Sequence, residues 1–104
     1  MSIEDVKTDK HKQTADFNMS AAACVDKIKA AIKDMRAVVT AEDEKRYYMI
    51  ADNFQDSFRS TIDTTQVGIL VTPTAPDKCR VEIASGNIDL AVFVSKELVK
   101  RVGG

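Results

Sequence analysis

The side chains of this 104-residue sequence that are best suited to nucleophilic catalysis belong to Cys24, Cys79 and His11. A thiol becomes a catalytic nucleophile when a base lies beside it, and His11 is the one histidine of the sequence. His11 falls within a polar N-terminal segment, whereas both cysteines fall at apolar positions of predicted core elements. The sequence therefore predicts buried, unreactive thiols, no catalytic residues and no enzymatic activity.

The two cysteines leave two interpretations open. They could be small buried hydrophobic residues, which is the interpretation that we favour. Alternatively, Cys24 and Cys79 could form a disulfide, because a helix residue and a strand residue can face each other across a core. Two cysteines are too few for a disulfide-rich scaffold, so the fold must depend on its apolar core.

Acidic residues and glycines are the other types that could build a site. The acidic run 42–44 and the scattered Asp52, Asp56 and Asp63 lack the spacing of a metal site, since consecutive turn residues point in different directions. Gly68 stands alone, whereas a phosphate-binding loop needs clustered glycines. We therefore expect no metal and no cofactor.

Cations and aromatic residues are interleaved at Lys45, Arg46, Tyr47, Tyr48 and Arg59. This pattern is found on stacking platforms for nucleic acids, but the acidic residues just before it oppose that function. Lys plus Arg total 15 and Asp plus Glu total 16, so no basic surplus attracts a phosphate backbone, and we expect no nucleic-acid partner. Arg46, Tyr47 and Arg59 with nearby carboxylates could form a small enzyme site only if they surround a substrate-sized polar pocket.

The composition places the chain among single globular domains. Hydrophobic residues make up 44% and aromatic residues 6%, so the core must be aliphatic. No apolar run approaches the roughly 20 residues of a membrane helix. The first residues do not form an export signal, which predicts a soluble chain as given.

The spacing of apolar residues predicts one α+β domain over residues 14–104, preceded by a flexible tail or tether over residues 1–13. We expect an antiparallel sheet of four to five strands with two helices packed on one face, in the order β-α-β-β-β-β-α. Strand-like alternation covers six segments, 14–19, 37–41, 47–50, 58–63, 67–72 and 79–84, from which the four to five strands of the sheet are expected, and the expected helices span 21–36 and 87–102.

The segment 88–94 could also be a strand, but Asn87 is a good helix N-cap and we favour a helix. A helix here carries more apolar residues than one face can bury. Ile88, Val92 and Phe93 therefore form a candidate interaction surface.

The runs Phe58–Pro73 and Cys79–Ser85 resemble strands in small domains of uncharacterised bacterial envelope lipoproteins. The resemblance covers roughly residues 15–102 and consists of apolar alternation. It implies a non-enzymatic envelope domain in which residues 1–13 form the tether. A membrane would be reached only through a lipid anchor that is absent from this chain. The family has no assigned activity, so the resemblance transfers no functional residues.

These observations favour a non-enzymatic bacterial envelope domain that binds a protein partner or forms a homodimer. The alternative is a cytosolic adaptor or chaperone-like protein-interaction module. We expect a location in the bacterial envelope, in the periplasm, if a signal has been removed, and in the cytoplasm otherwise.

Overall fold

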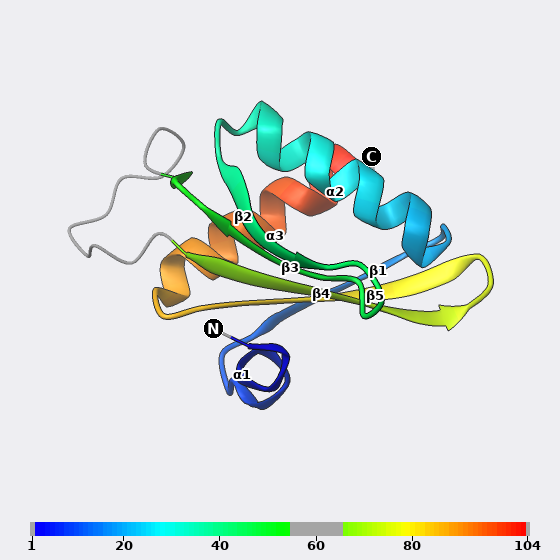
Figure 1. Ribbon diagram of the computed structural model, residues 1–104, viewed down its shortest axis with the longest axis horizontal. Coiled ribbons are helices and arrows are strands. Elements are labelled where there is room, and N and C mark those ends of the chain that lie inside the picture. Colours follow the sequence, from blue (N-terminus) through cyan, green and yellow to red (C-terminus); the bar gives the residue numbers. More distant parts are fainter. Residues whose placement is uncertain (1, 55–65, 104) are drawn as a thin grey trace.

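A computed structural model describes residues 2–54 and 66–103 of the chain (Figure 1). The predicted strand over 58–63 and the predicted site residue Arg59 lie outside these residues. The elements in chain order are α1 (Ile3–Thr8), β1 (Gln13–Phe17), α2 (Ala21–Asp34), β2 (Val38–Asp43), β3 (Tyr48–Asp52), β4 (Val67–Ala75), β5 (Lys78–Ser85) and α3 (Ile88–Val102).

The described strands form one antiparallel sheet in the order β1-β5-β4-β3-β2. Helices α2 and α3 cover one face of this sheet, and α1 lies on the opposite face (Figure 1). The predicted α+β class, the antiparallel sheet and the two helices on one face are confirmed. The sheet places β4 at its centre between β5 and β3 and leaves β1 and β2 at its edges.

Helix α2 forms where the apolar spacing predicts it. The Ser20 hydroxyl accepts a hydrogen bond of 3.2 Å from the backbone N–H of Ala23 and so caps the first turn. Buried residues recur at spacings of three and four residues along the helix, as in Cys24, Ile28 and Ile32. The chain leaves the helix through Arg36, whose φ of 62° reverses its direction before β2.

Residues 88–102 form helix α3, which decides between the helix and the strand that the sequence allowed. The Asn87 side chain accepts a hydrogen bond of 3.3 Å from the backbone N–H of Leu90. The N-cap and the basic residues in the last turn favour a helix over the local β-branched content. Gly103 ends α3 tightly against the Phe17 ring, where an added Cβ would lie 2.9 Å from a ring carbon.

The main core lies between the sheet and the helices α2 and α3. It is aliphatic, as the low aromatic content predicts, and Phe54 is the largest fully buried side chain in the described residues. A second, smaller cluster lies on the other face of the sheet and consists of Val6, Tyr48, Leu70 and Ala84.

The N-terminal segment differs from the flexible tail predicted for residues 1–13. Ser2 and Asp5 form a reciprocal capping box, which starts the short helix α1. Val6 of α1 is 0% exposed. Ile3 and Val6 are the apolar residues of this polar segment, and two such residues are too few to indicate a packing face from the sequence. Leu70 and Ala84, which alternate with core residues, supply the apolar second face of the sheet on which they pack.

Candidate functional site

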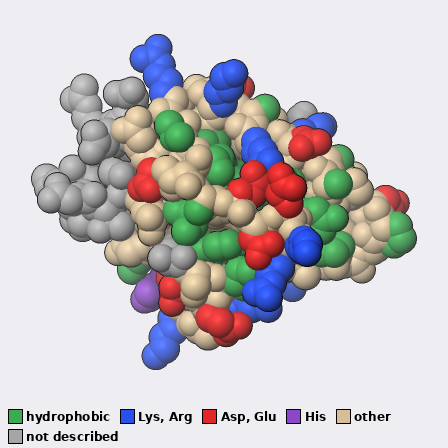
Figure 2. Space-filling model, in the orientation of Figure 1, with side chains coloured by type: hydrophobic (Ala, Val, Ile, Leu, Met, Phe, Trp, Pro, Cys, Tyr) green, Lys and Arg blue, Asp and Glu red, His purple; other side chains and the backbone are tan. Residues whose placement is uncertain are grey.

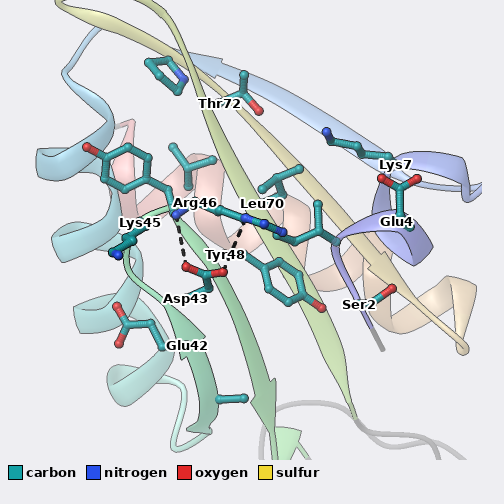
Figure 3. Close-up of a pocket in the computed structure, with 15 residues that line it drawn as sticks. Ser2, Glu4, Lys7, Glu42, Asp43, Lys45, Arg46, Tyr48, Leu70 and Thr72 are labelled. Atoms are coloured by element: carbon teal, nitrogen blue, oxygen red, sulfur yellow. Dashed lines mark hydrogen bonds and ion pairs between the residues drawn. The ribbon is translucent and has the colours of Figure 1, made fainter.

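A groove lies on the second face of the sheet, between α1 and the β2–β3 hairpin (Figure 3). Its volume is about 730 Å³, within the range of roughly 300–1,000 Å³ that ligand sites occupy. We call it the α1 groove. It is lined by Ser2, Ile3, Glu4 and Lys7 at α1, by Ala41, Glu42, Asp43, Lys45, Arg46, Tyr47 and Tyr48 of the hairpin, and by Leu70, Val71, Thr72 and Pro73 of β4.

A bulge in β2 decides which side chains of this strand reach the groove. The pairing with β3 shifts between Val39 and Ala41, so that Ala41 lies opposite Ile50 and Asp43 lies opposite Tyr48. Because paired residues point to the same face, the shift turns Ala41 and Asp43 toward α1. Nothing in the alternating sequence pattern of this segment marks that shift.

The β2–β3 turn holds Arg46 at the wall of the groove. The backbone N–H of Arg46 donates to the backbone carbonyl and to the carboxylate of Asp43, both at 3.3 Å. Tyr47 adopts a left-handed φ of 53°, and its carbonyl accepts a 2.9 Å hydrogen bond from the N–H of Val71. A non-glycine residue in this region is uncommon and needs support from its surroundings. The turn is therefore fixed to β4, and Arg46 reaches toward the middle of the groove (Figure 3).

Three cations (Lys7, Lys45 and Arg46) and three carboxylates (Glu4, Glu42 and Asp43) line the groove, and Glu4 has no ion-pair partner among the described residues. Arg46 contacts Asp43 at 3.8 Å, but both side chains are well exposed, so this pair is weak. Within residues 2–54 and 66–103, the ammonium groups of Lys7 and Lys45 have no ion-pair partner. Glu42 is engaged with Lys29 of α2 at 2.5 Å, and this contact raises the pKa of Lys29.

Tyr48 forms part of the groove floor and contributes a buried hydroxyl. Its side chain packs with Val6 and Leu70, and the residue is 8% exposed. In the described part of the chain, the Tyr48 hydroxyl has no hydrogen-bond partner. Burial, and then the charge of Asp5, raise the pKa of Tyr48. A buried unpaired polar group costs about 1–3 kcal/mol of stability.

Replacing Tyr48 with Phe should therefore stabilise the protein. Removing the unpaired hydroxyl should raise the free energy of unfolding by about 1 kcal/mol, because the ring contacts stay and the desolvation cost disappears. Urea unfolding followed by circular dichroism measures this change. Tyr47→Phe is the matched control, since Tyr47 is only half-buried, and it should have little effect. A loss of stability in Tyr48→Phe would show that the hydroxyl has a partner after all.

The predicted interaction surface on α3 is only partly exposed. Ile88 is 45% exposed, whereas Val92 and Phe93 are half-buried and Phe93 packs against the main core. Val99 is 47% exposed and lies on the same side of α3 as Ile88 and Val92, because spacings of four and seven residues return to one helix face. We call Ile88, Val92 and Val99 the α3 stripe. The sequence analysis missed Val99, although its spacing from Val92 was a usable signal.

The sequence-predicted basic and aromatic residues that the structure describes lie together at the β2–β3 hairpin. Arg46, Tyr47 and Tyr48 all line the α1 groove, so a polar pocket does surround part of the set considered for an enzyme. Tyr48 is buried and cannot offer its face to a base, which removes it from a nucleic-acid stacking platform. Figure 2 shows acidic and basic side chains interspersed on the face viewed, without a continuous basic surface.

Cys24 and Cys79 are both buried free thiols in the structure. The pKa of Cys24 is raised from 9.0 to about 12, mainly by burial and then by the neighbouring Cys79 thiol. A thiol with so high a pKa is protonated at neutral pH and is a poor nucleophile. Both cysteines belong to the main core, and neither lines the α1 groove.

This raised pKa predicts a loss of stability at alkaline pH. The unfolded chain loses the Cys24 proton near pH 9, whereas the folded chain keeps it until about pH 12. The stability that the protonated Cys24 contributes is therefore fully present below pH 9 and is lost as the pH rises from 9 toward 12. Between pH 8 and pH 10.5, the unfolding free energy of the reduced protein should fall by about 2 kcal/mol from this group. Urea unfolding in a phosphine reductant measures the fall. Cys24→Ala should show a shallower fall, and an equally steep fall in that variant would contradict the assignment.

In comparisons with known proteins, no family model, no curated protein and no solved structure matches this chain. Among the residues that the structure describes, no helix is long and apolar enough to cross a membrane. The same residues contain no group of three or more His, Cys, Asp or Glu side chains that could hold a metal ion.

Proposed function

We propose that this domain is a non-enzymatic binding module that takes a short segment of a protein partner into the α1 groove. The observation that supports this proposal is the groove itself, with an apolar floor and with Lys7, Lys45 and Arg46 on its walls beside three carboxylates. Ile3 is a partly exposed apolar side chain beside the buried Tyr48 and Leu70, and Lys7 and Arg46 stand on opposite sides of the groove (Figure 3). Such a site fits a segment with a large apolar residue next to an acidic one.

The charge pattern favours an acidic segment. Lys7 has no ion-pair partner among the described residues, and Arg46 is held only by its long contact with Asp43. A carboxylate from a partner could bind the Arg46 guanidinium at closer range than Asp43 does, and bidentate pairs of this kind are among the stronger charge-assisted hydrogen bonds. The groove would then gain a contact that the free domain lacks.

An enzymatic function is less well supported by the same groove. Arg46 and Tyr47 do line a pocket of sufficient volume, which is the condition that a small enzyme would require. However, the second tyrosine of the groove, Tyr48, is buried and its pKa is raised, so its hydroxyl stays protonated at neutral pH and is not a general base. Binding therefore uses the observed features of the groove more fully than catalysis does.

Selection from a random peptide library displayed on phage, with the purified domain as bait, tests the proposal. We expect the enriched peptides to share an Asp or Glu beside a large apolar residue. These peptides should not bind Val6→Asp, a variant designed to remove α1 from the sheet. Enriched peptides without acidic residues, or peptides that bind Val6→Asp equally well, would contradict the proposal.

Self-association is the second candidate function, and the α3 stripe favours it. Two α3 helices could bury their Ile88, Val92 and Val99 side chains against each other. Sedimentation velocity over a range of concentrations would detect the dimer. Val99→Asp should then restore the monomer without unfolding it, because Val99 is exposed.

The location in the bacterial envelope, and the alternative of a cytosolic adaptor or chaperone-like module, rest on the sequence analysis and stay predictions.

A further inference from the structure

The core of the domain brings its two cysteines together from distant parts of the sequence. Cys24 lies on the inner side of α2 and is 0% exposed, and Cys79 lies on β5 and is 1% exposed. Both belong to the main core cluster, in which α2 contacts β5. The sheet register pairs Cys79 with Phe17, another core residue, so the Cys79 side chain faces the helices.

The two thiols are close enough to influence each other. After burial, the neighbouring Cys79 thiol is the next cause of the raised pKa of Cys24. The chain contains two cysteines in all, so any intramolecular disulfide must join this pair. The geometry therefore offers one defined site for a covalent link between a helix and the sheet.

We propose that Cys24 and Cys79 form a reversible disulfide that is compatible with the native fold and fastens α2 to β5. The oxidant is a small disulfide such as oxidised glutathione. One cysteine thiolate attacks a sulfur of the oxidant and releases one glutathione thiol, leaving a mixed disulfide. The second cysteine thiolate attacks the protein sulfur and releases the second glutathione. Two electrons and the two thiol protons thus pass to glutathione.

The reaction should be slow in the closed native state. Both thiols are buried and Cys24 is protonated at neutral pH, so the attacking thiolate is scarce and inaccessible. The bond should form readily during folding, or when α2 separates briefly from the sheet. Slow oxidation in the folded state distinguishes a core disulfide from an exposed redox sensor.

Thermodynamic linkage gives the proposal a quantitative test. If the disulfide fits the native fold, then folding must favour the disulfide by the same factor by which the disulfide favours folding. For the long loop between Cys24 and Cys79, chain entropy sets this factor at roughly a thousandfold as an upper value. Strain in the native state would reduce it, and a factor of one would mean that the fold does not favour the bond.

The experiment measures the equilibrium constant for oxidation in glutathione buffers, once under native conditions and once in concentrated guanidinium chloride. Acid quenching, alkylation and intact mass spectrometry give the disulfide fraction. Equilibrium is approached from both the reduced and the oxidised protein, because native exchange should be slow. We expect the constant to be at least about tenfold larger in the native protein.

Thermal unfolding supplies the second measurement. The oxidised protein should unfold at a higher temperature than the reduced protein. Cys24→Ala/Cys79→Ala, which has no thiols, should not respond to the glutathione ratio. A native-to-denatured ratio of one or less, or a lower unfolding temperature after oxidation, would overturn the proposal. Either result would leave the α1 groove proposal unaffected, because the cysteines do not line that groove.

Discussion

Replacing Val6 with Asp is expected to release α1 from the sheet and abolish the α1 groove while the rest of the domain stays folded. Val6 is 0% exposed and is the one fully buried residue of this helix. An unpaired carboxylate is not tolerated at such a position, so the helix must leave the sheet to solvate it. A helix of six residues is not stable alone and should then unfold.

The loss of stability should be smaller than a buried charge usually causes. The cost is limited to the free energy that holds α1 on the sheet, for which burial of Val6 supplies about 1.5–3 kcal/mol. Release of α1 also lets water reach the unpaired Tyr48 hydroxyl, which offsets part of that cost. We expect a net decrease of about 1–2 kcal/mol in the free energy of unfolding.

Hydrogen exchange followed by NMR tests this prediction residue by residue. The amides of α1 should lose protection in Val6→Asp, whereas those of β4, β5 and α3 should keep theirs. His11→Asp adds the same carboxylate at an exposed position and is the matched control. Retained protection in α1, or global unfolding at neutral pH, would show that α1 is not a separately docked element.

The second large effect is expected from reversing the charges on the two walls of the groove. Lys7→Glu/Arg46→Glu should weaken binding of the selected acidic peptides at least about tenfold, which corresponds to about 1.4 kcal/mol. The reason is that both cations would be replaced by groups that repel the peptide carboxylate. Fluorescence anisotropy with a labelled peptide measures the dissociation constant.

The control variant must change the net charge equally without touching the groove. Lys96→Glu/Lys100→Glu does so, because both lysines are exposed on α3. This variant should change the dissociation constant less than threefold or so, through long-range electrostatics alone. Equal weakening by both variants would mean that the binding depends on net charge and not on the groove.

Much of the fold could be predicted because its main core follows simple periodicities. The spacing of Cys24, Ile28 and Ile32 predicted α2, and the alternation of Val81 and Ile83 predicted β5. The final helix was harder, since its β-branched residues also suit a strand. The Asn87 cap favoured the helix, and the structure confirms it.

The candidate site could not be predicted in the same way, because it depends on contacts between distant segments. Val6 and Ile3 are two apolar residues in a polar segment, and only the sheet face formed by Leu70 and Ala84 makes them a docking surface. The bulge after Val39 turns Asp43 toward the groove without a local sequence signal. Arg46 and Tyr47 were noticed as a cluster, but their pocket needs α1, which the sequence analysis interpreted as a tail.

Chemical-shift mapping tests most directly whether the α1 groove is the binding site. The ¹⁵N-labelled domain would be titrated with the tightest peptide from the selection, and the shift of each backbone amide would be followed. The groove account predicts the largest shifts at Lys7, Arg46 and Thr72, which line the groove from three separate elements. Largest shifts at Ile88 and Val99 of the α3 stripe, with the groove amides unchanged, would contradict it.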